Sequence, residues 1–68
     1  MIEVDARGLS CPEPLLRTRD AFNEFPGESY LVMVTDVNAR ENVKNFAIKE
    51  GREVTIDKKG QDFYLTIK

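Results

Sequence analysis

The chain has 68 residues, of which 41% are hydrophobic and 32% charged, a composition typical of an ordinary soluble globular domain that excludes collagen-like, disordered and membrane-spanning classes. Its formal net charge of −2 is spread over interspersed acidic and basic residues, so no basic field predicts direct nucleic-acid binding. A chain this short buries only about 60% of the surface of its unfolded form, so we expect one domain over residues 1–68 with its chemistry at the surface.

The N-terminal half predicts a strand followed by a helix. Residues 2–5 alternate apolar and polar side chains, as a half-buried strand does, and residues 7–10 indicate a turn. A helix is predicted from residue 12 to Phe25, because two prolines without N–H groups suit its first turn, and this places Cys11 at the N-cap. The predicted core-facing stripe consists of Leu15, Thr18, Ala21, Phe22 and Phe25.

The middle of the chain predicts a buried strand and a second helix. Residues 30–34 form a nearly continuous apolar run, which suits a central strand covered by helices. Asn38 followed by Glu41 resembles a capping box, so we expect a helix over residues 39–50 that stops at Gly51. The apolar stripe of this helix consists of Ala39, Val43, Phe46 and Ala47. A mild basic bias, typical of a solvated face, comes from Arg40, Lys44, Lys49 and Arg52.

The C-terminal residues predict a β-hairpin. Residues 54–57 and 63–67 alternate apolar and polar side chains on either side of a turn at Lys59 and Gly60. The element order is therefore βαβαββ, and because each helix has one apolar stripe, both helices must cover the sheet. We expect an α/β fold, a two-layer α/β sandwich with a mixed four-stranded sheet and two helices on one face.

The single cysteine is the main candidate for chemistry. One cysteine and no histidine exclude an intramolecular disulfide, the usual zinc ligand sets and a Cys-His or Ser-His dyad. A thiolate at a helix N-cap faces the positive end of the helix, so we expect the pKa of Cys11 to lie moderately below the usual value of about 8.5. The Glu13 amide is the expected donor to the sulfur. A lone cysteine is more often a small buried hydrophobe, but Ser10 would be the better cap, which favours a nucleophile.

Segment 5–14, Asp-Ala-Arg-Gly-Leu-Ser-Cys-Pro-Glu-Pro, resembles the hallmark of the TusA/SirA/YedF family of small sulfur-carrier domains. That hallmark is a Cys-Pro-x-Pro motif preceded by an Asp-x-Arg-Gly-type segment, and the resemblance spans the whole chain. Residues 34–36 and 39–43, with Gly51, look most like the YedF branch. The resemblance implies a βαβαββ fold like that of the C-terminal domain of translation initiation factor three.

The resemblance also implies a function. Cys11 would take up sulfane sulfur as a persulfide from a donor such as a cysteine desulfurase or a rhodanese, and pass it to a sulfur-acceptor protein. No cofactor and no metal are implied. Members of the YedF branch often carry a second domain that this chain lacks, so either a separate DsrE-like protein is the partner or this version stands alone. Such a protein is a carrier with or without sulfurtransferase activity of its own, and not a stand-alone multi-substrate enzyme.

Six residues are expected to support Cys11, namely Asp5, Arg7, Gly8, Pro12, Glu13 and Pro14. Asp5 would hold the loop by hydrogen bonds, Gly8 would permit a tight turn, and Arg7 would orient the loop or contact the donor. The prolines would fix the backbone, and Glu13 would tune the thiol. Leu16 would pack between the helices or contact a docking protein.

Two other functions fit the residues. A thiol redox sensor would use Cys11 to form a mixed disulfide or a dimer. A regulatory module would recognise protein or RNA through the surface of the second helix, with the cysteine as a relic. The first residues lack a basic and apolar leader, and no segment reaches the roughly 18 apolar residues of a membrane span, so we expect a cytoplasmic protein without membrane contact.

Overall fold

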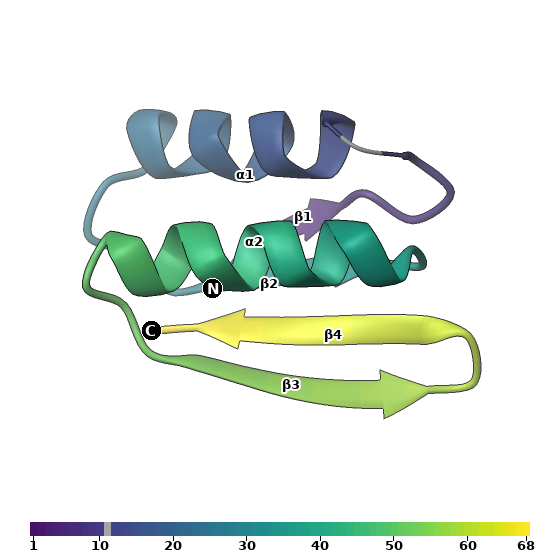
Figure 1. Ribbon diagram of the computed structural model, residues 1–68. Coiled ribbons are helices and arrows are strands. Elements are labelled where there is room, and N and C mark those ends of the chain that lie inside the picture. Colours follow the sequence, from purple (N-terminus) through teal and green to yellow (C-terminus); the bar gives the residue numbers. More distant parts are fainter. Residues whose placement is uncertain (11) are drawn as a thin grey trace.

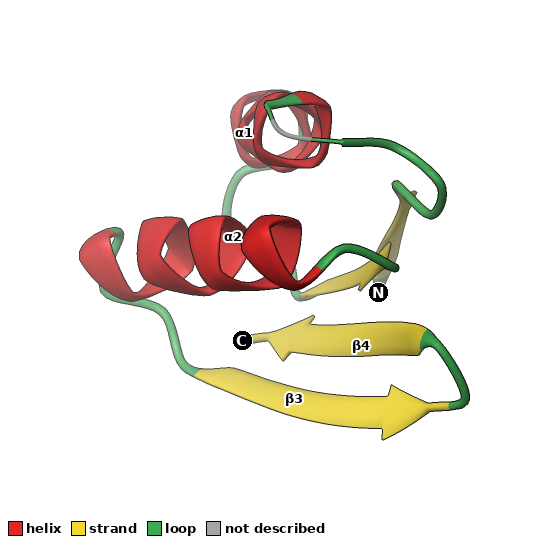
Figure 2. Ribbon diagram, turned by 45° about the vertical axis from the view of Figure 1, so that its right-hand side comes forward, coloured by secondary structure: helices red, strands yellow, loops and turns green. Residues whose placement is uncertain are grey.

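The computed structural model describes residues 1–10 and 12–68, and it confirms the βαβαββ order (Figure 1). The elements are β1 (Ile2–Asp5), α1 (Glu13–Glu24), β2 (Tyr30–Val34), α2 (Val37–Lys49), β3 (Val54–Lys59) and β4 (Asp62–Ile67). Both helices lie on one face of the sheet, so the predicted two-layer α/β sandwich is confirmed (Figure 2). In the part of the chain that the structure describes, no helix is long and apolar enough to cross a membrane.

The sheet has the strand order β1-β2-β4-β3 and is mixed, as predicted. β1 pairs with β2 in parallel because α1 carries the chain back across the sheet, whereas β4 pairs antiparallel with both β2 and β3. A two-residue turn that starts at Gly60 closes the hairpin, and Gly60 has a φ of +62°, which favours glycine there. β1 and β3 are therefore the two edges of the sheet.

The core lies between the sheet and the helices. In β4 the side chains alternate between buried and half-buried, as predicted for a strand with one covered face. One row across the sheet joins Val4, Val32, Leu65 and Ile56, of which the two central residues are fully buried. The helices contribute mostly small side chains, namely Ala21, Ala39, Val43 and Ala47. Small residues on both helices let the backbone approach the sheet closely, which suits so short a chain.

Helix α1 differs from the prediction in its start and in its buried face. It begins at Glu13 with Pro12 at the N-cap, one residue later than expected, and Pro14 is buried with Thr18 and Ala21. The Thr18 hydroxyl donates to the Pro14 carbonyl over 2.9 Å, which satisfies a hydroxyl with no exposed surface. Phe25 was predicted to be core, but it is 42% exposed and caps the helix. The predicted stripe is therefore confirmed at Thr18, Ala21 and the half-buried Phe22, which packs against the core, and Pro14 is covered in addition.

Helix α2 begins earlier than predicted because a different residue caps it. The Asp36 carboxylate accepts from the Ala39 amide over 3.0 Å, so Asp36 is the N-cap and Val37 the first helical residue. The predicted capping box of Asn38 and Glu41 is wrong. Glu41 lies instead 3.3 Å from Lys44 and 3.1 Å from Arg40, and these two cations lower the pKa of its carboxyl, Lys44 first.

Arg52 is not part of a free basic surface. Its guanidinium lies 5.3 Å from the ring centroids of both Phe22 and Tyr30. It also donates to the Lys68 carbonyl over 2.9 Å and to the Glu28 carbonyl. These contacts join the last residues of the chain to the loop before β2, at the end of the sheet opposite the cysteine motif.

Candidate functional site

The loop that follows β1 is bound to the neighbouring strand and to the connection after it. Ala6 is fully buried, and its amide donates to the Met33 carbonyl over 2.8 Å, which extends the pairing of β1. Gly8 has a φ of +78°, a conformation that favours glycine, and its amide donates to the Thr35 hydroxyl over 3.0 Å. The loop before Cys11 is thus fixed to the segment between β2 and α2, at the right-hand end of Figure 1.

Asp5, the last residue of β1, and Arg7 of this loop form a bidentate ion pair. The Arg7 Nε and Nη2 each lie 2.9 Å from one oxygen of the Asp5 carboxylate, and the Arg7 backbone amide donates to the same carboxylate over 3.2 Å. The side-chain bonds with Arg7, followed by its backbone bond, lower the pKa of Asp5 to about 2. The same contact raises the pKa of Arg7.

A second carboxylate joins this pair from a distant part of the chain. The Arg7 Nη1 lies 3.5 Å from Asp62, the first residue of β4, so Arg7 links the end of β1 to the start of the hairpin's second strand. The expectation that Asp5 holds the loop agrees with this geometry. Arg7 is 42% exposed while it makes these contacts, and its roles in orienting the loop and in contacting a donor stay predictions.

The first turn of α1 corrects one part of the predicted chemistry. The Glu13 amide donates to the Ser10 carbonyl over 3.0 Å, so it is already used and is not the free donor that the sequence predicted. The first helical bond runs from the Leu16 amide to the Pro12 carbonyl, also over 3.0 Å. Pro14 is buried and anchors this turn, whereas the side chains of Pro12 and Glu13 are exposed.

Cys11 lies outside the described residues, so the position of its sulfur and its lowered pKa stay predictions. Its expected place at the N-cap is taken by Pro12. Of the six supporting residues, the structure brings Asp5, Arg7 and Gly8 together in the loop before Cys11 and places Pro12, Glu13 and Pro14 in the first turn after it.

Three residues of this region were not among the predicted site residues. Thr35 accepts from Gly8, Asp62 contacts Arg7, and Val37 is an apolar side chain that is 52% exposed at the start of α2. Thr35 lies in the stretch 34–36 that resembles the YedF branch, but nothing in the sequence indicated its bond to Gly8, and no signal indicated Asp62. Leu16, expected either between the helices or on the surface, is half-buried.

Comparison with known proteins identifies the family. The family profile described as "Sulfurtransferase TusA" matches residues 2–68. "Sulfur carrier protein TusA" of Allochromatium vinosum is 35% identical over 68 residues, covering 97% of this chain and 90% of that protein. A "Putative sulfur carrier protein" of Archaeoglobus fulgidus is 31% identical, covering 98% of this chain and 93% of that one.

A solved structure agrees with the sequence comparisons. The crystal structure of the SirA-like protein from Desulfitobacterium hafniense superposes with a TM-score of 0.89 at 28% identity, covering 98% of this chain and 95% of that chain. The resemblance seen in the motif therefore extends to the whole fold, and the relatives support a sulfur-carrier role. Assignment to the YedF branch stays a prediction. The chain belongs to the TusA family of sulfurtransferases.

Proposed function

We propose that this protein is a sulfur relay that holds sulfane sulfur as a persulfide on Cys11 and passes it to a partner protein. The observation that carries the proposal is the loop before Cys11, which is held by the Asp5–Arg7 pair and by the bond from Gly8 to Thr35. A carrier cysteine must meet two different proteins in turn, and a preorganised loop beside it lowers the entropy cost of each encounter.

The transfer needs no oxidant and no reductant. The Cys11 thiolate attacks the terminal sulfur of a donor persulfide, the donor's S–S bond breaks, and the donor cysteine leaves as a thiolate while a new S–S bond forms on Cys11. In the second step an acceptor thiolate attacks the terminal sulfur on Cys11, and Cys11 leaves as the thiolate. The number of S–S bonds is unchanged in both steps. The start of α1 follows Cys11 directly, and a helix N-terminus favours such an anion by about 0.3–1 kcal/mol.

The partners are proposed to approach the end of the sheet where this loop lies. Exposed side chains there include Ser10, Pro12 and Glu13 around the motif and the apolar Val37 at the start of α2. A cysteine desulfurase or a rhodanese would supply the sulfur, and a separate DsrE-like protein is a candidate acceptor. The reactive group and the docking surface would then share one end of the molecule.

Recognition of RNA by the α2 surface is the weaker alternative. Arg40 and Lys44 contact Glu41, and Arg52 is held between rings and carbonyl groups, so these cations of the predicted basic face are already engaged. A redox sensor would also need a reactive Cys11, and only a sulfur-loading assay distinguishes it from a carrier.

Intact-mass measurement tests the proposal. The purified protein and a Cys11→Ser control are incubated with a cysteine desulfurase, cysteine and pyridoxal phosphate, and separately with a rhodanese and thiosulfate. A gain of about 32 daltons in the unsubstituted protein alone, reversed by a reductant, is the expected result. If the folded protein is alkylated at Cys11 but gains no sulfur from either donor, the relay proposal is wrong and the redox sensor takes its place.

A further inference from the structure

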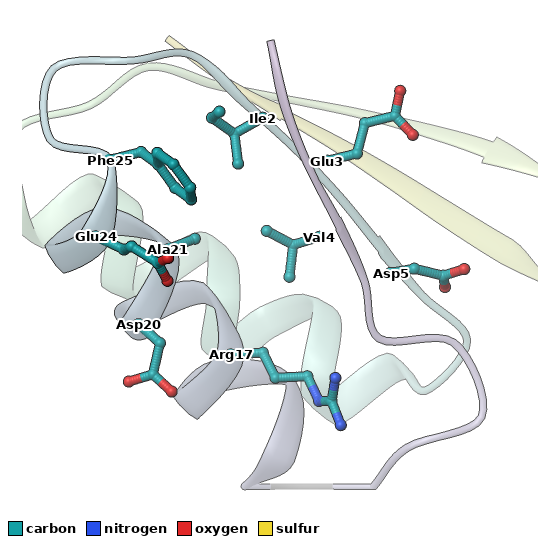
Figure 3. A pocket seen from close by; sticks show the side chains of 9 residues that line it. All are labelled: Ile2, Glu3, Val4, Asp5, Arg17, Asp20, Ala21, Glu24 and Phe25. Carbon is teal, nitrogen blue, oxygen red and sulfur yellow. The ribbon is translucent and has the colours of Figure 1, made fainter.

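A groove lies between β1 and α1, along the flank of the molecule (Figure 3). Its volume is about 270 Å³. It is lined by residues 2–5 of β1, by one side of α1 and by Phe25 at the helix C-cap. The groove runs from the middle of α1 to its C-terminal end, and none of its residues belongs to the cysteine motif except Asp5.

The floor of the groove is apolar. Val4 and Ala21 are buried at its base, Ile2 is half-buried, and Phe25 stands at one end with 42% of its surface exposed. Figure 3 shows Ile2 and Val4 directed from β1 toward the helix and Phe25. An aromatic ring left this exposed beside aliphatic side chains is a surface on which an apolar side chain from another molecule can pack.

The rim of the groove is acidic. Among the described residues Asp20 and Glu24 of α1 and Glu3 of β1 have no ion-pair partner, and Arg17 is the one cation that lines the groove. The Glu3 carboxylate points away from α1, on the other side of β1 (Figure 3). Asp20 and Glu24 lie four residues apart on α1, where like charges repel, and Glu24 ends a helix with no basic residue in its last turn. Both carboxylates are thus placed where they weaken the isolated helix, and a cationic ligand would relieve the repulsion.

The backbone of β1 also has a free side. The Ile2 amide donates to Ser29 and the Ala6 amide to Met33, so the even-numbered residues bond to β2. In a parallel pair the alternate residues face the other way, which directs the N–H and C=O groups of Glu3 and Asp5 away from the sheet. Because β1 is an edge strand, these groups are free to pair with another strand.

We propose that this groove and the free edge of β1 bind an extended segment of a partner protein in which lysine or arginine alternates with apolar residues. The segment would add to the sheet beside β1, with alternate side chains on the apolar floor. A second copy of this chain fits poorly, because antiparallel pairing of two β1 strands would bring Glu3 of one copy close to Asp5 of the other. The binding does not depend on sulfur chemistry at Cys11.

A peptide titration tests the proposal directly. The ¹⁵N-labelled Cys11→Ser protein is titrated with a blocked peptide of six residues in which valine alternates with lysine, and then with its valine–glutamate counterpart. When valine packs on the floor, the lysine side chains lie beside Glu3 on the other side of β1, and in the other register they lie beside Asp20 and Glu24 of α1. The expected result is a set of amide shifts confined to residues 2–5 and 17–25, at least about tenfold tighter binding of the lysine peptide, and weaker binding when NaCl is raised to about 200 mM.

Two variants separate the charges from the backbone edge. Glu3→Gln, Asp20→Asn and Glu24→Gln combined remove the unpaired carboxylates on both sides of β1, so this triple variant should weaken the lysine peptide at least about threefold in either register, whereas Asp57→Asn, an exposed carboxylate on the opposite edge strand, should not. Glu3→Pro removes an outward N–H without removing a bond to β2, so it should abolish binding while Glu3→Ala retains most of it.

The proposal is overturned if the lysine peptide causes no shifts in this region, if the glutamate peptide binds equally well, or if the control at Asp57 weakens binding as much as the triple variant. Since the titration uses the serine variant, its outcome is independent of the sulfur-loading assay, and each proposal can fail without the other.

Discussion

The bond between Gly8 and Thr35 offers a direct test of whether a fixed loop matters to the cysteine. Thr35→Val keeps the shape of the side chain but removes the hydroxyl that accepts from the Gly8 amide over 3.0 Å. A bond of this kind contributes about 0.5–1.5 kcal/mol to stability, and here it joins residues 27 positions apart. We expect a loss of about 1 kcal/mol in the free energy of unfolding.

The same change should slow sulfur loading. If loading requires the loop in its bonded conformation, a loss of about 1 kcal/mol corresponds to a rate lower by up to about fivefold. Urea denaturation gives the stability, and the time course of the mass gain with a cysteine desulfurase gives the rate. Thr55→Val, an exposed threonine of β3, is the matched control. An unchanged loading rate in a Thr35→Val protein that has lost stability would refute the link between loop order and reactivity.

Three further predictions concern the remaining contacts. The pKa of Asp5 is lowered from 3.8 to about 2, so its contribution to stability is fully present above pH 3.8 and is lost as the pH falls toward 2. Carboxyl NMR titration should show this low pKa, and Arg7→Gln should return it toward 3.8. Arg52→Met should lower the free energy of unfolding by about 1–3 kcal/mol, measured in urea, because two aromatic contacts and two bonds to carbonyl groups are lost. Asp36→Ala should cost about 1 kcal/mol in the same assay and Asn38→Ala close to nothing, and the reverse order would restore the predicted capping box.

The strands and the fold class follow from local patterns. Side chains that alternate along residues 63–67 place Phe63, Leu65 and Ile67 on one face, and those three are the ones buried. The continuous apolar run at residues 30–34 became the second strand of the sheet, bonded on both sides. Such patterns can be predicted from the sequence because the side chains of a strand alternate between only two faces of the sheet.

Helix ends and helix faces were less predictable. Asp36 and Asn38 are both good N-cap residues, and the local sequence does not decide between them. Asp36 caps α2 because the helix must start directly after β2 to lie over the sheet. In α1 the predicted Thr18, Ala21 and Phe22 do pack toward the core, but Phe25 is left at the surface because it is the C-cap and no longer follows the helical period. Periodicity indicates that a helix has an apolar face but not the residue at which the helix ends.

The residues of the candidate site likewise fall into two groups, those that the sequence predicted and those that only the tertiary structure brings together. The sequence alone singled out Cys11 and its flanking residues, since their chemistry and spacing are local, and it implied the sulfur-carrier family that the comparisons show. The contacts of Thr35 and Asp62 and the groove beside β1 came only from the tertiary structure. Arg7 and Asp62 lie 55 residues apart, and they meet only because the sheet brings the end of β1 and the start of β4 to the same end of the molecule. Contacts of that kind depend on strand order and register, which no local pattern in the chain encodes.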